Sequence, residues 1–310
     1  MTMKKLIYLG PGDVFARLQA PEGFELVHVT TAEGLNDAIT GCYGILDASM
    51  KFRITDAMVR EAPALRVIST ATTGSDHIDR GELGRRNVPV MTLKDDREFL
   101  RNVTPAAEHS WALLMACARR IPAALQHVRE GNWNREMFPG LMLKGKQIGI
   151  IGCGRIGSWM GRYATAFGMR VVGYDPYLAT LPPEIHATGL DDLLATSDFI
   201  TLHIHLTEEN KNFLSAERFR QIKQGAVIIN TSRGAVLDER ALLEGLVAGR
   251  IQAAGLDVLA TEPEIGTNIL VGYAREHDNL IITPHCGGFS PEAVLMVTQH
   301  ALNKILQFRG

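Results

Sequence analysis

Hydrophobic positions along this chain of 310 residues gather into short runs that alternate with stretches of helical periodicity. Short runs rich in Ile, Leu and Val predict strands, and the stretches between most of them predict helices. Alternating strands and helices indicate parallel sheets that are covered on both faces. The predicted strands form an early series and a late series: 5–9, 25–29, 44–47, 66–70 and 89–92, then 147–152, 170–175, 199–203, 226–230, 253–258 and 280–283.

A long helical pattern separates the two series. Thr104 is a favourable N-cap and Pro105 suits the first helical position, so we predict a helix over 106–129. We expect a break near Pro122, because an interior proline removes a backbone hydrogen bond. The predicted fold class is α/β, with two doubly wound parallel-sheet domains. The six strands of the late series match a complete doubly wound nucleotide-binding fold.

Composition and charge exclude several classes of protein. The net charge of -2 offers no basic surface for nucleic acid, and no apolar run reaches the roughly 18 residues that span a bilayer. The four cysteines include no Cys-x-x-Cys pair, which argues against a disulfide framework or a zinc site and favours a reducing, cytoplasmic location. His203 and His205 share one face of a predicted strand, but no acid or cysteine stands beside them. We therefore expect no metal.

A glycine-rich turn follows the first strand of the late series. Residues 152–157 read Gly-Cys-Gly-Arg-Ile-Gly, and a helix is predicted over 156–167. Gly152 permits a tight turn, Gly154 allows a pyrophosphate to approach the backbone, and Gly157 allows close packing of helix on strand. The free N–H groups at the helix start attract phosphate. Because strand, glycines and helix occur in this order, the turn predicts a dinucleotide site.

Asp175 ends the next predicted strand, at the spacing expected for a ribose ligand. A carboxylate there accepts hydrogen bonds from both ribose hydroxyls and repels a 2′-phosphate, which predicts NAD as the cofactor. The alternative is a structural turn with a surface aspartate. The register of strand, glycines, helix and acid favours the cofactor site.

Other polar residues follow the remaining strands of the late series. Ligands of open α/β sheets bind beyond the carboxyl ends of the strands, so we expect these residues to converge on one crevice. They are His203, residues 230–234, Asp257, Glu262 and residues 283–288.

Three of these residues suit the reduction of a 2-oxo acid. Arg233 offers a planar fork for a carboxylate, and a histidine such as His285 is the residue type that most often delivers a proton in catalysis. Glu262 can orient the imidazole. Each residue also has an alternative interpretation without a catalytic role. These are a surface ion pair for Arg233, a structural role for His285 and a solvated loop position for Glu262.

Five ordered motifs together resemble the D-isomer-specific 2-hydroxyacid dehydrogenases. The matching segments extend over most of the chain. They are residues 72–79, residues 152–157 with Asp175, residues 230–234 with Asp238 and Glu239, residues 256–258 with Glu262 and Pro263, and residues 283–288.

The resemblance implies a domain organisation and a partner. Residues 1–101, completed by a C-terminal helix over 291–310, would form a flavodoxin-like substrate domain, and residues 102–290 a Rossmann NAD-binding domain. A second copy of the chain would pair through the helix that follows Thr104.

The resemblance also implies site roles. Arg233, Glu262 and His285 match catalytic positions, and Thr73 and Gly74 would bind the substrate carboxylate together with Arg233 and His285. Further positions would line the cofactor: Thr104, His203, Thr231, Asp257 and Gly287.

We therefore expect an NAD-dependent oxidoreductase that interconverts a small 2-oxo acid and its D-2-hydroxy acid by hydride transfer. One alternative is a D-3-phosphoglycerate dehydrogenase, although such enzymes usually carry Arg-Ser where this chain has Ala48-Ser49. Another is a dinucleotide-sensing module like the corepressors that share this fold. The chain keeps all three catalytic candidates, which favours an enzyme.

Asp175 should make the protein prefer NADH over NADPH. Charge repulsion of the 2′-phosphate and unmet ribose hydrogen bonds together suggest a discrimination on the order of 2–4 kcal/mol. The measurement is kcat/KM with each cofactor, for the wild type and for Asp175→Asn. Equal kcat/KM values for the two cofactors in the wild type would contradict the assignment of Asp175 to the ribose.

Overall fold

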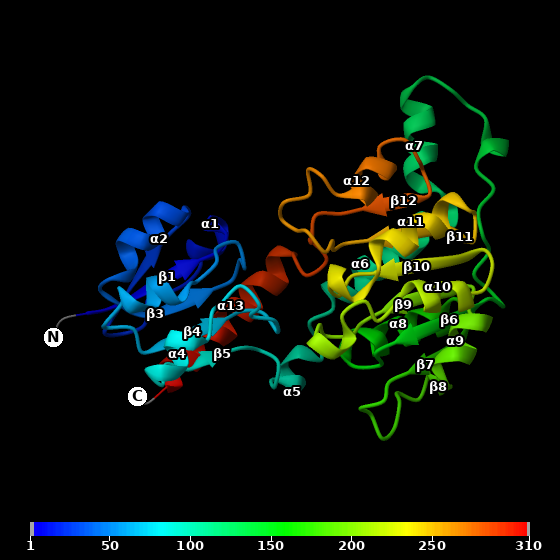
Figure 1. Cartoon of the computed structure of the whole chain (residues 1–310). Helices are drawn as coiled ribbons and strands as arrows, with labels where there is room; N and C mark the ends of the chain where they lie inside the picture. The colour runs from blue at the N-terminus through cyan, green and yellow to red at the C-terminus, as the bar shows by residue number, and fades with distance from the viewer. Residues whose placement is uncertain (1–2, 309–310) are drawn as a thin grey trace. The chain divides into compact units, whose positions relative to one another are not determined.

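The chain divides into two compact units in a computed structural model that describes residues 3–308. One unit comprises Met1–Val103 and Phe289–Gly310, and the other comprises Thr104–Gly288 (Figure 1). These limits lie close to the predicted domain boundaries. The ends of the predicted substrate domain, residues 1–2 and 309–310, lie outside the described residues. The role of the first unit in substrate binding stays a prediction.

The first unit is built on a five-stranded parallel sheet of order β2-β1-β3-β4-β5, the order of flavodoxin-like folds. The five predicted strands are all present. Their bounds are β1 (Lys4–Leu9), β2 (Phe24–His28), β3 (Cys42–Asp47), β4 (Val67–Thr70) and β5 (Val90–Met91). The helices of this unit are α1 (Gly12–Phe15), α2 (Ala32–Ile39), α3 (Asp56–Arg60), α4 (Gly81–Arg85), α5 (Arg97–Leu100) and α13 (Pro291–Gln307).

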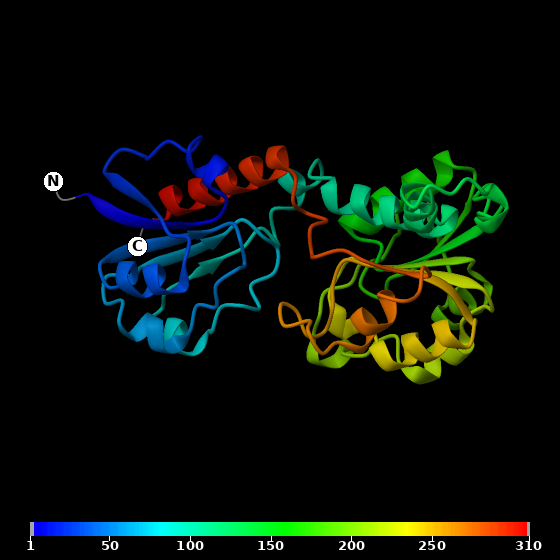
Figure 2. The same cartoon turned by 90° about the horizontal axis from the view of Figure 1, so that it is seen from above.

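Each face of this sheet buries its own apolar cluster. Along β1, Leu6 packs with side chains of α1 and α13, whereas Ile7 packs with side chains of α2, α3 and α4. Successive strand residues point to opposite faces, so a strand that is buried on both sides needs a continuous apolar run. Figure 2 shows α13 along one face of the sheet and α2 along the other.

The second unit holds a seven-stranded parallel sheet of order β12-β11-β10-β9-β6-β7-β8. This is a Rossmann arrangement, so the predicted fold class is confirmed. The bounds are β6 (Gln147–Ile151), β7 (Arg170–Tyr174), β8 (His186–Ala187), β9 (Phe199–Leu202), β10 (Ala226–Asn230), β11 (Ile251–Leu256) and β12 (Leu280–Ile282). The sequence predicted six of these strands and missed β8. This edge strand is two residues long and exposed, so it carries no apolar run.

Helices cover both faces of this second sheet. Side chains of α6 and α8 pack on one face, and side chains of α9, α10, α11 and α12 pack on the other. The bounds are α6 (Pro105–Arg119), α7 (Ile121–Arg129), α8 (Arg155–Ala166), α9 (Leu190–Thr196), α10 (Ala216–Gln221), α11 (Glu239–Val247) and α12 (Ile269–Ala274). Three short 3₁₀ helices span Arg135–Met137, Glu208–Asn210 and Gly234–Val236. Within residues 3–308, no helix is long and apolar enough to cross a membrane.

The long helix predicted over 106–129 is two helices in the structure. Arg120 adopts a left-handed conformation, with φ 51° and ψ 40°, and separates α6 from α7. Pro122 then lies in the first turn of α7, where its missing N–H costs nothing. Thr104 and Pro105 occupy the N-cap and the first position of α6 as predicted, but the Thr104 side chain caps no backbone N–H. Its hydroxyl donates instead to Glu108 Oε1 at 2.5 Å.

Candidate active site

The glycine turn lies between β6 and α8, and its shape excludes larger residues. Gly152 has a φ of 87°, and a Cβ there would lie 2.5 Å from the carbonyl oxygen of His203. A Cβ on Gly157 would lie 2.1 Å from the carbonyl oxygen of Gly152, whereas Gly154 faces open space. The turn therefore brings the start of α8 against the strand and leaves the backbone at Gly154 uncovered. These residues fit a dinucleotide, as the sequence predicted.

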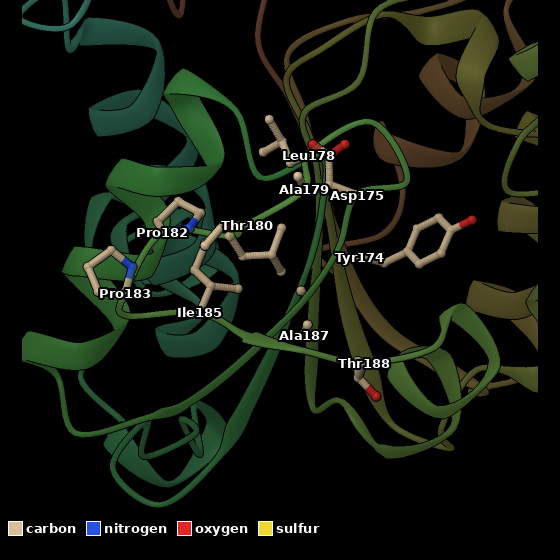
Figure 3. A pocket seen from close by; sticks show the side chains of 12 residues that line it. Tyr174, Asp175, Leu178, Ala179, Thr180, Pro182, Pro183, Ile185, Ala187 and Thr188 are labelled. Atoms are coloured by element: carbon tan, nitrogen blue, oxygen red, sulfur yellow. The ribbon is translucent and has the colours of Figure 1, made fainter.

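Asp175 follows β7 and binds back to this turn. Its Oδ2 accepts a hydrogen bond from the backbone N–H of Cys153 at 2.9 Å, and its Oδ1 accepts one from Tyr177 at 3.0 Å. Each carboxylate oxygen keeps a second lone pair for a ligand hydroxyl. A pocket of about 530 Å³ opens beside Asp175, lined by Leu178, Pro182, Ile185 and neighbouring residues. Figure 3 shows Tyr174 on the opposite side of β7 from Ile185 and Pro182.

The ends of β9 and β10 carry two further predicted residues. His203 follows β9, and its Nε2 lies 2.8 Å from Thr201 Oγ1. Burial lowers the pKa of His203 to about 3, so this imidazole is neutral at physiological pH. Thr231 follows β10 and shares a hydrogen bond of 2.6 Å with Ser110 Oγ on α6. Sequence reasoning did not identify Ser110, because Ser110 and Thr231 lie 121 positions apart.

Arg233 lies on a loop that is stabilised by hydrogen bonds between its own residues. The Asn230 side chain donates to the carbonyl of Arg233 at 3.0 Å and accepts from the Ser232 amide at 3.0 Å. A Cβ on Gly234 would lie 2.0 Å from the carbonyl carbon of Leu259, so only glycine fits there. The loop therefore holds the backbone of Arg233 in one position.

His285 and Glu262 come together as the sequence predicted. His285 Nδ1 lies 2.8 Å from Glu262 Oε1, and Glu262 Oε2 accepts from the amide of Leu259 at 3.2 Å. An ionised carboxylate only accepts, so Nδ1 carries the proton of this bond. Nε2 is then the ring nitrogen that can give or take a proton at a ligand.

Asp257 follows β11, is 2% exposed, and organises the end of the sheet. Its Oδ2 accepts from the amide of Gly287 at 2.7 Å, and its Oδ1 accepts from the hydroxyl of Thr283 at 2.5 Å. His109 on α6 lies beside it, with Nε2 at 3.3 Å from Oδ1. Thr283 belongs to the predicted segment 283–288, whereas sequence reasoning missed His109, which carries no motif of its own.

Thr73 and Gly74 lie in the other unit, in the loop after β4. The hydroxyl of Thr72 donates to the carbonyl of Gly74 at 2.7 Å. Nearby, His77 Nε2 lies 2.5 Å from Asp47 Oδ2 at the end of β3. These contacts tie the loop to the sheet, and a carboxylate-binding role for its amides stays a prediction.

The fold and the glycine turn together define a dinucleotide-binding protein. Residues 111–287 match the family model for the NAD-binding domain of D-isomer specific 2-hydroxyacid dehydrogenases. The chain belongs to this family, so both the predicted resemblance and the NAD-binding domain are confirmed.

Similar proteins include enzymes of different substrate classes. A D-3-phosphoglycerate dehydrogenase of Mycobacterium tuberculosis is 38% identical over 235 residues, which are 75% of this chain and 43% of that protein. A hydroxypyruvate reductase of Thermotoga maritima is 34% identical over 261 residues, 83% of this chain and 82% of that protein. The structure of D-lactate dehydrogenase from Escherichia coli matches with a TM-score of 0.83 and 27% identity, covering 98% of this chain and 96% of that one. The chain thus spans less than half the length of the mycobacterial relative.

The lowered pKa of His203 predicts a pH-dependent loss of stability. The unfolded chain protonates this histidine near its ordinary value of 6.5, whereas the folded chain does so only at about 3. The contribution of neutral His203 is therefore complete above pH 6.5 and declines as the pH falls towards 3. Denaturant unfolding should show the wild type losing stability relative to His203→Asn over this range. The exposed His186, changed to Asn, is the control. Parallel stability curves for the wild type and His203→Asn would contradict the assignment.

Proposed function

We propose that the chain is an NAD-dependent oxidoreductase that interconverts a small 2-oxo acid and its D-2-hydroxy acid. The observation that carries this proposal is the 2.8 Å contact between His285 Nδ1 and Glu262 Oε1. This pair lies in the same unit as the glycine turn and Asp175, beyond the carboxyl ends of parallel strands. An oriented acid–base pair in a dinucleotide-binding domain suits hydride transfer coupled to proton transfer.

The residues have distinct tasks in this proposal. The nicotinamide, when bound, supplies or accepts the hydride at C2 of the substrate. Arg233 binds the substrate carboxylate through its planar fork and polarises the carbonyl. His285 donates its Nε2 proton to the carbonyl oxygen during reduction and takes it back during oxidation. Glu262 keeps the imidazole in the required tautomer and orientation.

The cofactor would be bound along the edge where the strands of the second unit end. Gly152, Gly154, Arg155, Ile156 and Gly157 would receive the pyrophosphate, and Asp175 the ribose hydroxyls. Thr104, His203, Thr231, Asp257 and Gly287 complete the proposed cofactor site. Thr73 and Gly74 of the first unit would offer backbone amides to the substrate carboxylate.

A phosphoglycerate dehydrogenase is the second candidate function. The 38% identity with the mycobacterial enzyme favours it. Against it, Ala48 and Ser49 replace the expected Arg-Ser pair, and Ser49 Oγ donates to the buried carboxylate of Asp47 at 3.1 Å. A buried acid held beside this position does not attract a phosphate. We therefore favour an unphosphorylated 2-oxo acid. The corepressor alternative gains no support from the relatives reported above.

The partner we propose is a second copy of this chain. Ile121, Leu125 and Val128 are spaced along one face of α7, and each is more than 40% exposed. Trp133 and Met142 follow, 90% and 73% exposed. Several exposed large apolar side chains along one helix face are typical of an interface. Sedimentation velocity should report a dimer, and Leu125→Glu should shift the equilibrium to monomer. A monomeric wild type at micromolar concentration would contradict this partner.

The four cysteines all carry free thiols. Unpaired cysteines are typical of a reducing compartment, which supports a cytoplasmic location.

The test of the activity combines a substrate screen with variants of the acid–base pair. NADH consumption should be faster with glyoxylate, pyruvate or hydroxypyruvate than with 3-phosphohydroxypyruvate, and the product should be the D isomer. His285→Ala should lower kcat by roughly 10²–10⁴, the range for a lost general acid, while NADH still binds. Glu262→Gln should cost less, because the imidazole keeps a hydrogen-bond partner.

The matched control is Glu264→Gln, an exposed acid of the same loop. Its kcat should equal that of the wild type. A His285→Ala enzyme with wild-type kcat would refute the proposed proton donor. A higher kcat/KM for the phosphorylated acid would favour the second candidate.

A further inference from the structure

A histidine, an aspartate and a cysteine with the chemistry of metal ligands meet at the end of the second sheet. His109 comes from α6, Asp257 follows β11, and Cys286 follows β12. Cys286 Sγ lies 3.9 Å from His109 Nε2 and 3.7 Å from Asp257 Oδ1, and Nε2 lies 3.3 Å from the same oxygen. The histidine and the cysteine are 177 positions apart in the chain, so the spacing of residues in the sequence does not predict this cluster.

These separations suit a tetrahedral ion. Zinc binds sulfur at about 2.3 Å and nitrogen or oxygen at about 2.0–2.2 Å, which places tetrahedral donors about 3.4–3.6 Å apart. The three observed separations, 3.3, 3.7 and 3.9 Å, each differ from that range by a few tenths of an ångström. Thr283 Oγ1 lies 2.5 Å from Asp257 Oδ1 and 2.9 Å from His109 Nε2, so the ion would replace these two hydrogen bonds. Side-chain movements of this size would complete three corners of a coordination tetrahedron and leave the fourth for water.

The carboxylate is already fixed in place by other groups. Gly287 N donates to Asp257 Oδ2 at 2.7 Å, and Cys286 N donates to Oδ1 at 3.0 Å. Hydrogen bonds that orient a ligand from behind are a regular feature of protein metal sites. The His109 side chain is 22% exposed and Cys286 is partly exposed, so an ion can reach the cluster from solvent.

The chemistry of the donors selects the class of ion. Thiolate and imidazole are soft donors that favour zinc and similar transition metals over magnesium or calcium. An aspartate and a thiolate together also balance the charge of a divalent cation.

We propose that His109, Asp257 and Cys286 bind one Zn²⁺ or another thiophilic divalent cation, and that the bound ion excludes the dinucleotide. On binding, the Cys286 thiol gives its proton to solvent and its sulfur coordinates the ion. The exclusion rests on the proposed function, in which Asp257 and Gly287 line the cofactor site. An ion bound to Asp257, together with its water ligand, would occupy both the carboxylate and the space beside it, so that neither is available to the dinucleotide.

The experiment titrates the chelator-treated, cofactor-free protein with Co²⁺ and then with Zn²⁺. One Co²⁺ per chain should give a thiolate-to-cobalt charge-transfer band, and Zn²⁺ should displace it. Cys286 is the natural source of this band, because Cys42, Cys117 and Cys153 are buried. Cys286→Ala should abolish the band and weaken Zn²⁺ binding by more than about 100-fold, since even orienting partners of a ligand account for 10–100-fold.

Matched controls separate the cluster from other thiols and histidines. Cys42→Ala in the first unit and His186→Gln on the exposed strand β8 should keep the band and the Zn²⁺ affinity. Melting curves check that each variant folds, and His109→Gln provides a second ligand deletion that leaves the thiol in place. Equal Zn²⁺ affinity in the wild type, Cys286→Ala and His109→Gln would overturn the site.

NADH fluorescence titration tests the exclusion separately. Zn²⁺ should weaken NADH binding to the wild type and leave NADH binding to Cys286→Ala unchanged. Unchanged NADH affinity of the wild type at saturating Zn²⁺ would overturn the exclusion. A protein that binds Co²⁺ through Cys286 but never binds NADH would support the metal site and refute the proposed function instead.

Discussion

The pairing of parallel strands is the constraint on which the rest of this structure depends. Parallel strands connected through helices all end at the same edge of their sheet. In the second unit this edge receives the glycine turn after β6, the carboxylate after β7, and polar residues after β9 to β12. Both faces of such a sheet are apolar and must be covered by helices, which accounts for the two apolar clusters of that unit.

One buried carboxylate then couples several of these strand ends. Asp257 accepts hydrogen bonds from Thr283, Cys286 and Gly287, and it lies beside His109 of α6. A buried charge is stable only when it is fully hydrogen-bonded, so these partners hold the segment after β12 in position. His285 belongs to this segment, and its distance to Glu262 depends on that position. The same partners that satisfy Asp257 therefore also help to orient the proposed proton donor.

The relatives share the family but differ in the acid named for each enzyme. Phosphoglycerate, hydroxypyruvate and lactate enzymes all match this chain. This range fits a division of tasks in which the second unit supplies the cofactor edge and the acid–base pair.

Local signals in the sequence were sufficient to predict the fold class, the glycine turn and the position of Asp175 after the next strand. The positions of Glu262 and His285 after two strands of the same series predicted that the two side chains would meet. Continuous apolar runs mark strands that are buried on both sides, and a glycine turn needs only a few neighbouring residues. The sequence did not predict β8, which has no apolar run, and it did not predict that the Thr104 hydroxyl at the N-cap of α6 donates to Glu108. His109 and Ser110 joined the site only through tertiary structure. Both lie on α6, and only the packing of α6 on the sheet brings His109 to within 3.9 Å of Cys286, which is 177 positions away.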